Sequence, residues 1–318
     1  MQIVKTFLSI LVFVLLSACV STSVKESTLG TIDVSPEMVL NSSPLGEGTE
    51  NLDLSSVDIL EMTPEMIEFV ESYMEGSTNR YRRMQRLVHA IIGDGNFNLV
   101  YDDKTRTASE TFTAARGNCL SFTNLFIAMA RYLEIHAEYQ EVDIPPDWSL
   151  AGESFFFSQH VNVLVDLGVG MQRVVDFNIY DFQPTYERRT ITDARGRAHY
   201  FSNIGVEHMM NGNNTLAYAN FRQALKEDSR FSPAWINMGI LHRREKYPNY
   251  AETSYKQALE IYQFNLIAMS NLANLYEEEG KSEWAEQYKD RVRLHRMSNP
   301  YYRYAQANTA FIDGDYRT

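Results

Sequence analysis

The chain has 318 residues, 44% of them hydrophobic and 12% aromatic, which is enough for packed cores and suggests two domains. Its 29 basic and 41 acidic residues give a formal net charge of −12, which argues against a nucleic-acid partner and against a polybasic membrane contact. The sequence has no cluster with zinc spacing, no dinucleotide loop and no Gly-x-Ser-x-Gly elbow, so we expect no metal and no cofactor.

The N-terminus has the pattern of a signal peptide. Lys5 gives a positive start, Phe7 to Leu16 form an apolar run, and small residues lead to Cys19. The run is shorter than the roughly 20 residues that span a membrane. The stretch LSAC resembles a bacterial lipobox. The resemblance implies that the leader is removed before Cys19, that Cys19 carries a diacylglycerol, and, since Val20 follows, that the protein is anchored in the outer membrane of a bacterial cell envelope. An ordinary signal peptide or a single membrane anchor is the alternative.

The composition of the next segment predicts a flexible tether. Residues 20–57 are rich in Ser, Thr, Gly, Pro and acidic residues without sustained periodicity, as in a flexible linker. If Cys19 is lipidated, Cys119 has no partner for an intramolecular disulfide. An unpaired thiol in an exported protein suggests a chemical role for that thiol.

Helical patterns precede the second cysteine. Thr63 and Pro64 are typical of an N-cap and first turn, residues 81–92 carry an apolar face, and residues 107–115 are helical in character. Another helix is expected to begin at Cys119, with Asn118 as its N-cap. Its buried face is predicted from helical spacing to comprise Phe122, Leu125, Phe126, Met129, Ala130 and Leu133.

Cys119 therefore lies in the first turn of a predicted helix. Unpaired N–H groups and the positive end of the helix dipole favour a thiolate there, and the same N–H groups can bind an oxyanion. The alternative is a small buried hydrophobic residue, which is the commoner fate of a free cysteine.

A nucleophilic cysteine needs a base, and His160 lies in a predicted strand over residues 154–167. Alternation places His160 on one face with Asn162. A turn near Gly168 or Val169 leads to a return strand over residues 173–178, which brings Asp176 to the face of His160. A carboxylate there can orient the imidazole. The alternatives are a hydrogen-bonded, half-buried histidine and a solvated acid.

Three stretches, GNCLSFTNLFIAMARYL, HVNVLV and VVDFN, together resemble the transglutaminase-like, papain-fold core of many bacterial proteins. The resemblance covers about residues 97–178 and implies an α+β fold of helices and an antiparallel sheet. It implies that Cys119 is the nucleophile, His160 the base and later the acid, and Asp176 the residue that orients it. The implied chemistry is acyl transfer through a thioester on a glutamine or peptide carbonyl. Leu120 and Phe177 depart from the aromatic residue and the proline of crosslinking members, which leaves the substrate open.

The C-terminal third contains a repeat of 34 residues, the tetratricopeptide period. Small residues recur at that spacing: Ala217, Ala251 and Ala285 in one register, and Gly205, Gly239, Ala273 and Ala307 in another. The segment resembles tetratricopeptide repeats, which implies an all-α solenoid that binds a protein or peptide partner. His208 and His242 share one repeat position, and we interpret them as packing residues.

The sequence thus predicts four parts: a signal peptide at 1–18, a flexible tether at 19–57, a transglutaminase-like domain at 58–197 and tetratricopeptide repeats at 198–318. Two functions stay open. The first is a membrane-anchored cysteine hydrolase or acyltransferase whose repeats bind a partner. The second is a binding or scaffold lipoprotein in which the repeats carry the function.

Overall fold

The structure, a computed structural model, describes residues 33–49, 51–74, 76, 79–92, 97, 99–143, 150–151, 154–155, 160–177, 186–298, 303, 307, 311 and 314. The predicted signal peptide and Cys19 lie outside the described residues. Residues 34–318 form one compact unit. In the described ranges, no helix combines the length and the apolar content needed to cross a membrane.

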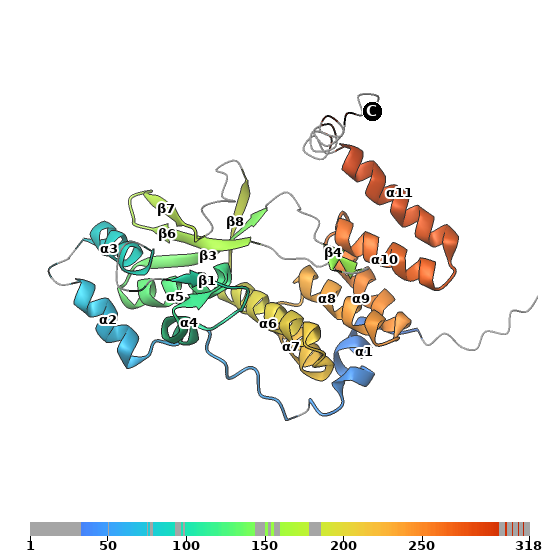
Figure 1. Cartoon of the computed structure of the whole chain (residues 1–318), viewed down its shortest axis with the longest axis horizontal. Helices are drawn as coiled ribbons and strands as arrows, with labels where there is room; N and C mark the ends of the chain where they lie inside the picture. The colour runs from blue at the N-terminus through green and yellow to red at the C-terminus, as the bar shows by residue number, and fades with distance from the viewer. Residues whose placement is uncertain are drawn as a thin grey trace, which may run out of the picture. The chain divides into compact units, whose positions relative to one another are not determined.

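An antiparallel sheet and one long helix form the core of the first half. The sheet has four strands in the order β7–β6–β3–β8 (Figure 1). Their bounds are β3 His136–Asp143, β6 His160–Asp166, β7 Gln172–Val175 and β8 Glu187–Ile191. Helix α5, Cys119–Tyr132, contacts β3 and β6 and buries Leu125, Phe126 and Met129 completely. The helix predicted to begin at Cys119 is confirmed.

Shorter elements surround this core. They are α2 Pro64–Met74, α3 Arg80–Ile92, α4 Ala108–Ala114, and the parallel pair β1 Val100–Tyr101 and β2 Arg116–Gly117. A further antiparallel pair, β4 Leu150–Ala151 and β5 Ser154–Phe155, lies elsewhere, and its strand β5 contacts the helix α10, Leu266–Glu278 (Figure 1). The predicted start at Thr63 and Pro64 is confirmed, because the Thr63 hydroxyl accepts the Met66 N–H at 3.3 Å.

Residues 193–298 form six helices, arranged as three antiparallel pairs. Their bounds are α6 Asp193–Met210, α7 Asn214–Glu227, α8 Ser232–Arg244, α9 Pro248–Ile261, α10 Leu266–Glu278 and α11 Ser282–Ser298. The second helices of the pairs begin 34 residues apart. A Cβ atom at Gly205 or Gly239 would lie 2.5 Å from the ring of Phe221 or Tyr255, so the small residues permit the close approach within each pair.

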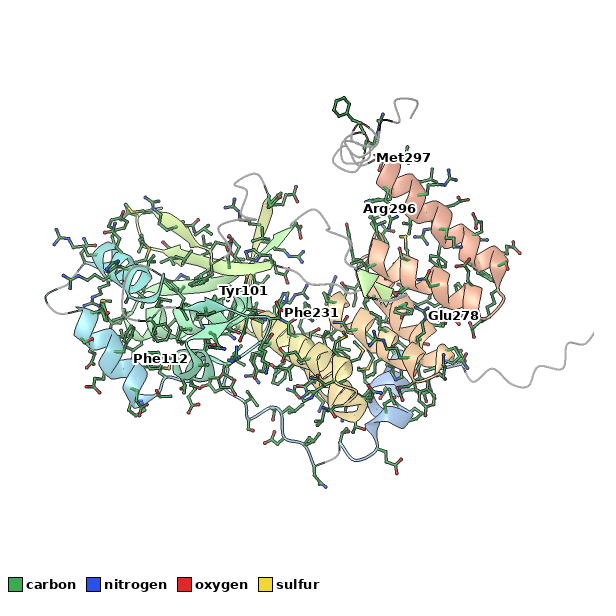
Figure 2. The ribbon with its side chains drawn as sticks, in the orientation of Figure 1. Tyr101, Phe112, Phe231, Glu278, Arg296 and Met297 are labelled. Atoms are coloured by element: carbon green, nitrogen blue, oxygen red, sulfur yellow. The ribbon has the colours of Figure 1, made fainter. Side chains whose placement is uncertain are left out.

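Helix α6 belongs to both halves. It begins at Asp193, with the Thr192 hydroxyl as its N-cap, and runs without a break through the domain boundary expected at residue 197. The buried Glu141 of β3 accepts from His199 Nε2 at 2.7 Å and Arg195 Nε at 2.9 Å, both on α6. Phe231, labelled in Figure 2, packs on the His199 ring at 4.5 Å between centroids. The sheet is thereby joined directly to the first helix of the repeats.

The predicted tether needs a correction between residues 34 and 57. Helix α1, Pro36–Asn41, packs against α9, and the 3-10 turn η1, Pro44–Gly46, packs against α7. Val39 is fully buried, and the Tyr218 hydroxyl lies 2.7 Å from the Leu40 carbonyl and 3.0 Å from that of Val39. We call residues 34–49 the strap. A few apolar anchors and backbone carbonyls hold it on the repeats, and such a pattern lacks the periodicity that reveals a helix or strand.

His242 is a packing residue, as predicted, and also a contact of the strap. Its Nε2 lies 2.8 Å from the Ser43 hydroxyl, and its ring stacks on Tyr250 at 5.2 Å. Burial lowers the pKa of His242 to about 4, so the ring is neutral at pH 7 and accepts or donates without charge.

The strap gives a first prediction. Val39→Asp places an unpaired charge in a fully buried position, which is costly, so the strap should detach from α7 and α9. Limited proteolysis should then cut within residues 34–57 much faster than in the wild type. Glu37→Asp, an exposed change on the same helix, is the control. Equal cleavage rates in all three proteins would contradict the docking of the strap.

Candidate active site

The start of α5 is capped by the residue before the cysteine. Asn118 Oδ1 accepts the Ser121 N–H at 3.0 Å, and the Phe122 N–H bonds to the Asn118 carbonyl at 3.1 Å. The N–H groups of Cys119 and Leu120 are the two that the helix leaves without an intrahelical partner. Cys119 is partly exposed and not in a disulfide. A thiol beside two free N–H donors is thus available at the helix start.

Gly117 lets the chain enter this helix. A Cβ atom at Gly117 would lie 2.5 Å from Cβ and 2.9 Å from Oγ of Ser121, closer than side chains tolerate. Any larger residue would push the chain away from the first turn of α5. The glycine two positions before the cysteine is therefore required by space.

The loop of residues 102–107 braces the same turn. Asn118 Nδ2 donates to Thr105 Oγ1 at 2.7 Å, and the Ser121 hydroxyl donates to the Lys104 carbonyl or to Asn118 Oδ1. Arg106 forms a bidentate pair with Asp102 at 2.8 and 2.9 Å, and this hydrogen bond lowers the pKa of Asp102. Asp102 therefore holds the loop in place through Arg106.

His160 and Asp176 meet across the β6–β7 hairpin. The pairing of Val163 with Val175 centres the turn on Val169, as the sequence predicted. His160 Nε2 lies 2.9 Å from Oδ1 and 2.8 Å from Oδ2 of Asp176, and the two side chains are 8% and 7% exposed. Because Nε2 faces the carboxylate, Nδ1 is the ring nitrogen left for the thiol.

The Cys119 thiol lies near enough to the His160 ring to affect its pKa. Burial alone would lower the pKa of His160, but hydrogen bonds with Asp176 and Cys119 and the nearby negative charge outweigh burial and raise it to about 9. The structure thus brings together the three residues proposed from the sequence. They come from a helix start, a strand start and the position directly after the next strand.

Phe177 fixes the end of the aspartate strand against the cysteine helix. Its ring lies 5.4 Å from that of Phe122 and 6.3 Å from that of Phe126, both on α5. Leu120, the other departure from the family pattern, is 4% exposed and belongs to the core. Phe177 thereby joins the segment that carries Asp176 to the helix that carries Cys119.

Sequence reasoning assigned no role to Asn162, although it placed Asn162 on the face of His160. Its Nδ2 donates to Asp176 Oδ2 at 2.8 Å. The signal was the alternation of β6, which puts residues 160 and 162 on one face. His136 is exposed at the start of β3, away from these residues.

Residues 67–164 match the family model of the transglutaminase-like superfamily, so the chain contains a transglutaminase-like domain. The match includes Cys119 and His160 and ends before Asp176. The search of curated proteins found no match. Among 24 matching chains of solved structures is "Crystal structure of MamA", at 17% identity, covering 31% of this chain and 58% of that chain with a TM-score of 0.30. That likeness is too slight to extend to function.

The raised pKa of His160 predicts a pH dependence of stability. The pKa is about 9 in the folded protein against an ordinary 6.5, so the stabilisation is complete below pH 6.5 and is lost as the pH rises through 9. This difference corresponds to about 3 kcal/mol. Urea unfolding at pH 6 and pH 9.5 measures it.

The comparison is with Asp176→Asn, which removes the largest interaction that raises the pKa of His160. Its loss of stability between pH 6 and pH 9.5 should be smaller than that of the wild type. His136→Gln, a change at an exposed histidine, should behave as the wild type. Identical pH dependence in wild type and Asp176→Asn would refute the assigned pKa.

Proposed function

We propose that the protein is a cysteine enzyme that forms a thioester with the carbonyl of a glutamine side chain or a peptide and passes the acyl group to water or an amine. The observation that carries the proposal is that His160 lies between Cys119, at the start of α5, and Asp176, to which its ring is hydrogen-bonded. The transglutaminase-like match at residues 67–164 supports the same chemistry.

In the first half-reaction the Cys119 sulfur attacks the carbonyl carbon and the C=O π electrons move to the oxygen. The tetrahedral intermediate collapses, the C–N bond breaks, and the His160 imidazolium gives its proton to the leaving nitrogen. Ammonia or an amine departs and a thioester remains. Asp176 accepts from Nε2 and holds the ring so that Nδ1 faces the sulfur.

In the second half-reaction His160, now neutral, takes a proton from water or from an amine as that nucleophile attacks the thioester. The C–S bond breaks, and the thiolate and the imidazolium are restored. The products are a carboxylic acid or a new amide. The N–H groups of Cys119 and Leu120 stabilise the oxyanion in both halves, since they point out of the helix start.

The anchor is part of the proposal. Cys19, lipidated, would hold the protein at the outer membrane on its periplasmic side. The strap starts at Val34, so at most about 50 Å of extended chain separates it from Cys19, at roughly 3.4 Å per residue. Because the strap packs on α7 and α9, the repeats would stay within that reach of the lipid.

We also propose that the repeats bind a protein partner. Helix α8 is buried along Pro233–Arg243, so this helix offers little surface. The last pair exposes more: Trp284, Leu294 and Met297 of α11 are each more than half exposed, and Met297 is labelled in Figure 2. The partner surface is expected there.

The enzyme class is tested with a Cys19→Ser chain, in which Cys119 is the remaining thiol of the two in the sequence. It should hydrolyse p-nitrophenyl acetate with a burst, and Cys119→Ala should abolish the burst. His160→Ala should slow hydrolysis about 100-fold, because it removes the base. Iodoacetamide should alkylate Cys119 faster at pH 7 in the wild type than in His160→Ala.

His136→Ala is the matched histidine control and should leave both rates unchanged, since it is exposed at the start of β3. A thiol that resists iodoacetamide in the folded protein at every pH, with no ester hydrolysis above background, would overturn the enzyme and favour the binding module.

The anchor is tested by growing the expressing bacteria with radiolabelled palmitate. The wild type and Cys119→Ser should be labelled, and Cys19→Ser should not be. A wild type that is processed elsewhere and stays unlabelled would refute lipidation without touching the enzyme.

A further inference from the structure

Asn162 holds the carboxylate of Asp176 from inside the sheet. It lies on β6, its side chain is 0% exposed, and the β6–β7 register places it beside Asp176. Its Nδ2 donates to Asp176 Oδ2 at 2.8 Å, on the same oxygen that lies 2.8 Å from His160 Nε2. Two side chains of one strand, both on one face, thus fix the carboxylate.

The orientation of this amide follows from the contact. If the amide were flipped, Oδ1 would face a carboxylate oxygen at 2.8 Å, and two acceptors would repel each other. When Nδ2 donates to Asp176, Asn162 Oδ1 is buried and has no hydrogen-bond partner among the described residues. A buried acceptor without a partner destabilises the fold.

An apolar side chain of the same size would avoid that cost. Asn162 occupies a position where only the Nδ2 group of its amide has a hydrogen-bond partner in the described chain, and that partner is Asp176. Gln140, the cross-strand partner of Asn162, is 6% exposed and its Oε1 likewise has no partner in the described part of the chain, but no contact joins its side chain to Asp176 there. Both residues are therefore buried and both have an unpartnered amide oxygen, but only Asn162 contacts Asp176.

We propose that Asn162 is a positioning residue for the acyl-transfer reaction, acting through Asp176 to keep His160 Nδ1 directed at Cys119. The inference rests on the proposed function. Asp176 follows the last residue of β7 and is not itself in the strand, so its backbone alone does not fix the carboxylate. Without the Nδ2 donor the carboxylate loses the partner on the oxygen that it shares with His160, so the imidazole is held less firmly.

The test compares Asn162→Leu with Gln140→Leu in the Cys19→Ser chain, with p-nitrophenyl acetate as the probe. Asn162→Leu should lower kcat about 10- to 100-fold, the range for groups that orient a reacting residue, with KM unchanged. Its melting temperature should change little, because losing the unpartnered Oδ1 stabilises the fold while losing the donor to the buried Asp176 carboxylate destabilises it. Gln140→Leu should keep kcat within about twofold of the wild type and should gain stability, because it removes the unpartnered Oε1.

A second readout follows the thiol directly. Iodoacetamide alkylation of Cys119 at pH 7 should slow in Asn162→Leu and not in Gln140→Leu. Should the leucine variant fail to fold, Asn162→Ala removes the donor without a clash and gives the same two readouts.

The failures are distinguishable. If the wild type shows neither ester hydrolysis nor alkylation that depends on His160, the proposed function is overturned and this inference falls with it. A wild type that has both, beside an Asn162→Leu protein that keeps its kcat and loses only melting temperature, overturns this inference alone and makes Asn162 a structural residue.

Discussion

The buried charge of Glu141 is the constraint on which the two halves of the molecule depend. This side chain is 1% exposed and receives Arg189 Nε at 2.6 Å, Arg195 Nε at 2.9 Å and His199 Nε2 at 2.7 Å. Burial would raise the pKa of Glu141, but the bonds from His199 and Arg195 hold it well below its usual range. Burial lowers the pKa of His199, so a neutral ring donates to an ionised carboxylate. Removing any one donor would leave a buried charge poorly compensated.

The same strand carries the site. In the β3–β6 pairing, Val142 lies opposite His160 and Glu141 lies opposite Val161. The ion pairs of Glu141 are therefore one residue along β3 from the position that faces His160. Tyr139, on the same face as Glu141, is fully buried and donates to Asn124 Oδ1 of α5 at 2.8 Å. One face of β3 therefore contacts both α6 and the cysteine helix. Cutting the chain at residue 197 would divide α6 and remove His199 from this network, so the repeats are not a separable part.

What could be predicted from the sequence depended on local signals. Asn118 before an apolar helical pattern located the start of α5, and glycines around Val169 fixed the centre of the hairpin and hence which residues face each other. The 34-residue phase located the helical pairs. In each case the residues that decide the structure lie within one turn or one repeat of each other.

What could not be predicted depended on partners distant in the sequence. Strand β3 contains Glu138, Gln140 and Glu141, and such polar residues do not indicate a buried strand. Glu141 can be buried because residues of β8 and α6 neutralise its charge, and these residues are distant in the sequence. The sequence of the strap predicts a linker. Its docking could not be predicted, because its contacts are with Tyr218 and His242, roughly 180 and 200 residues away along the chain. Ion pairs and carbonyl contacts of this kind leave no periodic pattern.

Two buried polar residues of the sheet show how structural and functional polarity differ in one molecule. Glu141 is surrounded by donors, and a fully satisfied polar group can belong to the core at little net cost. Asn162 satisfies one half of its amide, and the other half costs roughly 1–3 kcal/mol as a buried acceptor without a partner in the described chain. Because the satisfied half faces Asp176, the residual cost is most simply explained by the orientation of the carboxylate, and hence of the histidine beside the thiol.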